Sequence, residues 1–139
     1  MNENNKDKAS LVVSKILRET QEGSIKWSIF YNNKSDIQSD DDTFVIGNVY
    51  VTHIDTKDFR IYRFKLKIET SPFYTTNKEE LKWRHCYRLE LYNSTTGRSE
   101  WIFPNTNAIY DLYEVVCTQV SGINDFLSKY LNEDKREAD

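Results

Sequence analysis

The stretch FRIYRFKLKIE at residues 59–69 alternates between apolar and charged side chains over most of its length. One alternate set is large and apolar: Tyr62, Phe64, Leu66 and Ile68. The other set begins with Ile61 and is then charged: Arg63, Lys65, Lys67 and Glu69. Because successive side chains of a strand point to opposite faces, this pattern predicts a strand with one buried face. An antiparallel sheet with its other face in water fits it.

Four more strands are predicted around this stretch, at residues 25–31, 43–54, 83–92 and 99–103. They are rich in β-branched and aromatic residues, and polar segments separate them. Gly47 predicts a bulge within its strand, and residues 55–58 and 93–97 predict tight turns. Residues 32–42 and 70–82 are expected to be polar loops. Strands that follow one another in this way predict an antiparallel meander of about five strands.

A helix is predicted at each end of the meander, which makes the chain an α+β protein. From Lys8 the apolar residues recur at helical spacing until Gly23, which suits the position just past a helix end. After Pro104, a second stripe runs from Ile109 across Gly122 and predicts one long helix of roughly 25 residues, packed on one face of the sheet, with Gly122 as the place where it could bend. The polar tails at residues 1–7 and 133–139 are expected to be flexible.

The C-terminal helix is apolar over a wider arc than a sheet needs. Val115, Gly122 and Phe126 lie beside its main stripe and widen the arc to roughly 180°. Something must cover this extra surface, and either the N-terminal helix or a second copy of the chain could do so. These three residues are therefore the candidate helix interface.

Length and composition favour one domain without a membrane span. The chain has 139 residues, and 19 basic against 22 acidic residues give a net charge of −3. That balance does not indicate a protein built around nucleic-acid phosphates, although a local basic face stays open. Two cysteines do not make a disulfide framework, so we expect a reducing, cytoplasmic location.

No motif for catalysis, metal binding or a cofactor emerges. His85 and Cys86 are neighbours on one strand and must point to opposite faces. The two histidines and two cysteines lack the close-paired spacing of structural zinc sites, and the four glycines form no phosphate-binding loop. The aspartates of residues 36–42 suit a solvated loop better than a calcium site. We therefore expect a protein that is not an enzyme and holds no cofactor.

The outer sheet face is the most distinctive predicted surface. If the strands at 59–69 and 83–92 pair suitably, five side chains meet there: Arg63, Lys65, Lys67, Arg88 and Tyr92. Cations beside an aromatic ring could bind single-stranded nucleic acid, by phosphate contacts and base stacking. An ordinary solvated face is the simpler interpretation, since lysine and arginine also discourage unwanted strand pairing.

Two functions follow as hypotheses. The first is a small interaction protein that binds another protein, with dimerisation as one route; it depends on the wide helical arc. The second is a module for single-stranded nucleic acid that uses the basic outer face. An enzyme or small-ligand carrier would need a pocket, which sequence cannot reveal.

Overall fold

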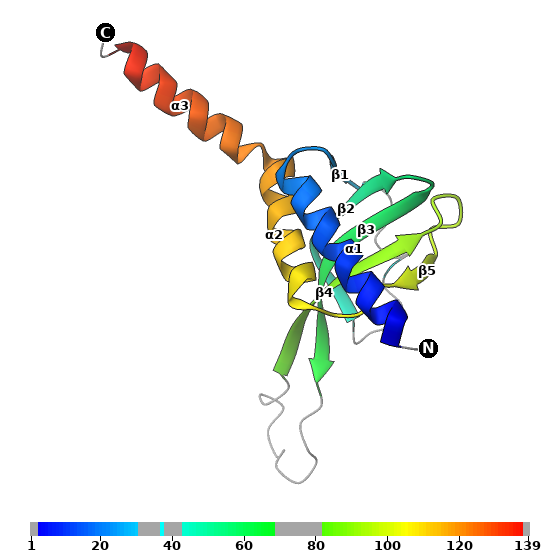
Figure 1. Ribbon diagram of the computed structural model, residues 1–139. Helices are drawn as coiled ribbons and strands as arrows, with labels where there is room; N and C mark the ends of the chain where they lie inside the picture. The colour runs from blue at the N-terminus through cyan, green and yellow to red at the C-terminus, as the bar shows by residue number, and fades with distance from the viewer. Residues whose placement is uncertain (1–2, 31–36, 38–42, 69–81, 138–139) are drawn as a thin grey trace.

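The computed structural model describes residues 3–30, 37, 43–68 and 82–137 (Figure 1). It confirms the α+β class, with a helix, a five-stranded antiparallel sheet and C-terminal helices. Along the chain the elements are α1 (Glu3–Gln21), β1 (Ser28–Ile29), β2 (Thr43–Ile54), β3 (Lys57–Ile68), β4 (Lys82–Tyr92), β5 (Ser99–Ile102), α2 (Asn107–Ser121) and α3 (Ile123–Glu137). Helix therefore covers part of both tails that we expected to be flexible.

The sheet is the predicted meander, with spatial order β1-β2-β3-β4-β5 and every neighbouring pair antiparallel. The bulge expected at Gly47 is present. Ile46 pairs with Arg63 and Tyr50 with Ile61, so residues 47–49 of β2 lie opposite Tyr62 alone. Gly47 has a φ of 71°, which a residue with a side chain rarely adopts.

The main core lies between the sheet and two helices. Figure 1 shows α1 and α2 side by side across one face of the sheet, and the two helices contact each other. The buried residues of this cluster come from both helices, from the segment before β1, from β2, β3 and β4, and from the residue after β5: Ala9, Val13, Ile16, Ile25, Trp27, Tyr50, Phe59, Ile61, Leu89, Phe103, Ile109, Leu112, Tyr113 and Val116. Burial of apolar surface on this scale is the main force that holds the fold.

Gln119 joins α2 to the chain between α1 and β1. Its side-chain oxygen accepts a hydrogen bond from the Trp27 backbone N–H at 2.8 Å. Its amide nitrogen donates to the backbone oxygens of Ile25 at 2.8 Å and of Thr20 at 3.3 Å. One side chain thus bonds the last turn of α1 and two backbone groups of the irregular segment after it, and buried backbone groups need such partners.

The opposite face of the sheet is not the solvated face that the sequence suggested. Val49, Tyr62 and Phe64 form a second buried cluster there, with half-buried Phe30, Ile37, Val45 and Cys86 packed against it. Phe30, which follows β1, also meets the ring of Tyr92 on β4, with 5.9 Å between centroids. A residue next to the first strand therefore reaches the fourth, so the sheet curls around this second cluster.

The expected single core is consequently split between two faces. Phe59 and Ile61 point toward the helices, whereas Tyr62 and Phe64 point into the second cluster. Leu66, expected in the core, is 37% exposed. Both alternate sets of β3 carry apolar residues at its start, and the pattern alone misassigned the face that the helices cover.

The long C-terminal helix is in fact two helices. Gly122 adopts a left-handed conformation with φ 68° and ends α2, and its N–H donates to the Gln119 carbonyl at 3.2 Å. Glycine is favoured at this position after a helix because it carries no Cβ. Beyond it α3 starts in a new direction and projects away from the rest of the chain (Figure 1).

Candidate functional site

The five residues of the predicted basic face do not share one face. Arg88 pairs directly with Tyr62, and directly paired residues point to the same side of a sheet. Arg88 and Tyr92 therefore lie on the face of the second cluster, while Arg63, Lys65 and Lys67 lie on the helix-covered face. The prediction that they form one surface was wrong, because the pairing register differs by one residue from the one it required.

Arg88 and Tyr92 are occupied with internal contacts. The Arg88 guanidinium lies over the Phe64 ring, 4.5 Å from its centroid, and donates to the Tyr62 hydroxyl at 3.4 Å. Tyr92 is 7% exposed, and the Arg60 guanidinium lies 4.7 Å from its ring centroid. Burial and the negative charge of Asp58 raise the pKa of Tyr92. Neither side chain offers an open ring or a solvated cation to a ligand.

Arg63, Lys65 and Lys67 instead face three rings of β4. Arg63 pairs with Tyr87, Lys65 with His85 and Lys67 with Trp83. We call these six residues the cation–aromatic ladder. Lys65 Nζ lies 4.6 Å from the centroid of the Trp83 ring and 5.7 Å from that of Phe44, and the two rings meet edge to face at 5.5 Å. The ladder runs outward along the ends of β3 and β4, beyond the N-terminal end of α2 (Figure 1).

A second candidate surface is the apolar stripe of α3. Five large side chains at helical spacing are exposed along it: Ile123, Phe126, Leu127, Tyr130 and Leu131. Phe126 and Leu131 are 59% and 61% exposed, and the rings of Phe126 and Tyr130 stack at 6.0 Å. The residues between them are polar: Asn124, Asp125, Ser128 and Lys129. We call the five apolar residues the α3 stripe.

The candidate helix interface is divided by the break at Gly122. Val115 and Gly122 line a hollow of about 480 Å³ between α2 and the end of α1, together with Thr20 and Gly23. Phe126 lies beyond the break, on α3. The N-terminal helix α1 thus covers part of the wide apolar arc, which was one of the two expected ways of covering it. The part of the arc on α3 stays exposed.

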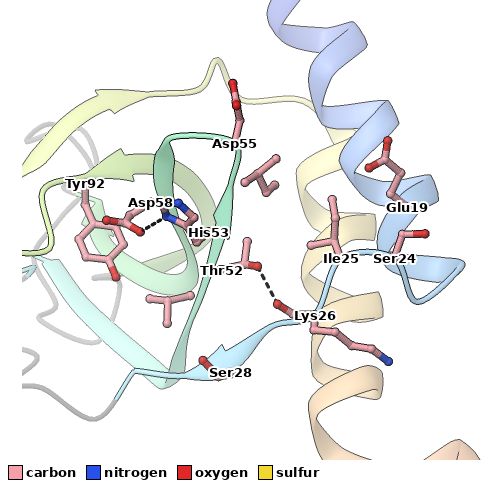
Figure 2. A pocket seen from close by; sticks show the side chains of 12 residues that line it. Glu19, Ser24, Ile25, Lys26, Ser28, Thr52, His53, Asp55, Asp58 and Tyr92 are labelled. Carbon is pink, nitrogen blue, oxygen red and sulfur yellow. Dashed lines mark hydrogen bonds and ion pairs between the residues drawn. The ribbon is translucent and has the colours of Figure 1, made fainter.

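A hollow of about 700 Å³ lies between β2 and the segment that links α1 to β1 (Figure 2). His53 Nδ1 and Asp58 Oδ1 are 2.7 Å apart at its edge. Figure 2 shows Lys26 on the opposite side, and its backbone carbonyl accepts a hydrogen bond from the Thr52 hydroxyl at 2.6 Å. A histidine–carboxylate pair can move a proton, but within the described part of the chain no hydroxyl or thiol is hydrogen-bonded to His53. The His53 side chain of this pair is 62% exposed.

The remaining chemistry-bearing residues are also dispersed. Cys86 and His53 lie on β4 and β2, which are not neighbours in the sheet. Both cysteines are free thiols. Across the described ranges, no three histidine, cysteine or acidic side chains come close enough to hold a metal ion. Most of the aspartate-rich loop at 32–42 and nearly all of the polar segment at 70–82 lie outside the described residues.

Comparison with models of known protein families, with curated proteins and with solved structures finds no match to this chain. Among the helices that the structure describes, none is long and apolar enough to cross a membrane. The candidate surfaces therefore have to be interpreted from their own chemistry.

Proposed function

We propose that the protein is a non-catalytic interaction module that binds another protein through the α3 stripe, with a second copy of the chain as the partner that this surface favours. One observation carries the proposal: five large apolar side chains lie exposed along one side of a helix that projects from the body. Contiguous exposed apolar surface of this kind is typical of a protein-binding site. The proposal involves no cofactor.

The length of α3 supports the need for a partner. It has 15 residues, and an isolated helix of that length is only marginally stable in water. Most helical stability in proteins comes from packing an amphipathic face. A partner that covers the α3 stripe would supply this packing, and two copies of α3 can do so for each other about a two-fold axis.

The alternative function, binding of single-stranded nucleic acid through the predicted basic outer face, depended on five residues that do not share one face. Arg88 and Tyr92 lie on the other face from Arg63, Lys65 and Lys67. A cytoplasmic location stays part of the proposal. It is supported by the two cysteines, which are free thiols, as is usual in a reducing compartment.

Sedimentation velocity tests self-association. We expect a dimer that dissociates on dilution between about 100 µM and about 1 µM, a range typical of a modest interface. Phe126→Asp should leave a monomer at all concentrations, because it places a charge in the middle of the stripe. Ser128→Asp adds the same charge to the polar side of α3 and is the matched control. A wild-type monomer throughout this range, or a dimer that persists in Phe126→Asp, would overturn the proposal.

A further inference from the structure

We infer that the cation–aromatic ladder is a binding site for single-stranded nucleic acid, distinct from the α3 stripe. Each of its three rows places a cation of β3 beside a ring of β4: Arg63 with Tyr87, Lys65 with His85 and Lys67 with Trp83. Sites for single strands combine cations that follow the phosphates with rings on which bases stack. The ladder has both elements in alternate positions on one surface.

The charge of the ladder is not neutralised within the described part of the chain. No carboxylate there lies within 4.0 Å of Arg63, Lys65 or Lys67, since the ion pairs found involve other residues. Lys67 is exposed and Lys65 is half-buried against Trp83. The net charge of −3 belongs to the whole chain, so the ladder is a local positive surface on an acidic protein. Such a surface selects an anionic ligand.

The rings are placed for stacking. Trp83 is 39% exposed, and its orientation is fixed by Lys65 and by the edge of Phe44. His85 is exposed in the next row. The exposed ring of Tyr110 on α2 meets Tyr87 edge to face at 4.9 Å and adds one more ring at the inner end of the ladder. Flat rings held by their neighbours lose little freedom when a base stacks on them.

The ladder also continues into a concave surface. A hollow of about 440 Å³ lies where β4 meets the start of α2, and its lining includes His85, Tyr87, Asn107 and Tyr110. The first turn of α2 contains no acidic residue, and Thr106 before it makes no capping hydrogen bond through its side chain. The partial positive charge of this helix end therefore adds to that of the ladder. A strand that lies along the ladder would lead into the hollow.

Fluorescence anisotropy with labelled single-stranded DNA and RNA oligonucleotides tests this site. At low salt, about 50 mM, we expect micromolar affinity that falls steeply as salt increases. Lys65→Gln with Lys67→Gln should lower the log–log salt slope by about 1.4, or about 0.7 for each cation. Trp83→Ala should weaken binding by about 5- to 150-fold, the equivalent of one lost stacking contact. A duplex of the same sequence should compete poorly, because its bases are already stacked.

The controls use the opposite end of β3 and the other surface. Lys57→Gln removes an exposed cation from the same strand as Lys65 and Lys67, but Lys57 lies at the far end of β3, where it pairs with Ile54 of β2. It should change affinity less than twofold, and so should Phe126→Asp on α3. Lys67→Gln disturbs no core contact, so its effect stands even if Trp83→Ala reduces stability. Absence of binding at this salt concentration, or equal losses in Lys57→Gln and Lys67→Gln, would overturn the inference.

Discussion

Arg60 and Glu90 lie directly opposite each other on β3 and β4, and their side chains form an ion pair from which solvent is excluded. Arg60 Nε and Glu90 Oε1 are 2.6 Å apart, and each side chain is 2% exposed. The guanidinium also donates to the Gly97 carbonyl at 3.1 Å, which ties the turn before β5 to the sheet. The pair lies on the face of the second cluster, where the sheet curls.

Glu90→Gln should lower the free energy of unfolding by about 3–5 kcal/mol, because it leaves the Arg60 cation buried without a counter-charge. Urea unfolding followed by circular dichroism measures the loss. The double variant Arg60→Met with Glu90→Leu should be more stable than Glu90→Gln, since it leaves no unpaired charge. A loss below about 1 kcal/mol in Glu90→Gln would contradict the buried pair.

Leu112→Ala should cost about 2–5 kcal/mol, from lost burial and the cavity left behind. Leu112 belongs to α2 and is fully buried in the core between the two helices and the sheet. Asp111→Ala changes the exposed neighbour on the same helix and should stay within about 0.5 kcal/mol of the wild type. Chemical denaturation of both variants compares them, and equal losses would show that this face of α2 was misassigned.

Gln119→Ala should destabilise the protein by about 1–3 kcal/mol, because the backbone groups of Ile25 and Trp27 lose their side-chain partner. The effect should be local. Hydrogen exchange should become faster at the Trp27 amide, while amides in the middle of β3 keep their protection relative to global stability. Unchanged exchange at Trp27 would mean that Gln119 does not hold this segment.

Stability should decrease in alkaline solution as Tyr62 ionises. Burial, followed by the negative charge of Glu90, raises the pKa of Tyr62 from 10.0 to about 12. The folded state therefore holds the phenolic proton more tightly than the unfolded state. Its contribution is complete below pH 10 and is lost between pH 10 and about 12.

Tyr62→Phe tests this dependence. Burial also raises the pKa of Tyr50, Tyr92 and Tyr113, so the variant should reduce the slope of stability against pH in that window rather than abolish it. Urea midpoints between pH 9 and about 12 give both slopes. Identical slopes for the variant and the wild type would contradict the assignment to Tyr62.

Most of the fold was predictable because its signals are local. Alternation in residues 59–69 and helical spacing before Gly23 each depend on neighbours in the chain, and both elements are present. Gly47 carried its own signal for a bulge and has one. The sequence indicated Gly122 as a possible bend but not as the end of one helix and the start of another, because the apolar residues continue in phase on both sides and the pattern is the same for a single helix. Only the left-handed φ of Gly122 reveals the change of direction.

The candidate surfaces depended on register, which is a property of two strands together. All the hydrogen bonds between β3 and β4 together decide whether Lys67 pairs with Trp83 or with a neighbour of Trp83. The sequence indicated correctly that cations and aromatic rings would lie close together. The prediction that Arg88 shares a face with Arg63, Lys65 and Lys67 was wrong. A signal was available: Trp83, His85 and Tyr87 alternate in the same phase as Leu89, which is buried under the helices.

Gly122 also determines how far α3 can reach. Its 15 residues make a rod about 22 Å long that is attached to the body through a single residue without a side chain. Apart from the adjoining chain, no heavy atom of the described residues lies within 4 Å of the position that a Cβ would occupy there. A change of about 20° in one dihedral angle of this joint would swing the far end of the rod through roughly 8 Å, by the geometry of its length. The direction in which α3 presents its apolar stripe to a partner is therefore set by the backbone angles of this one joint and not by the packing of the body behind it.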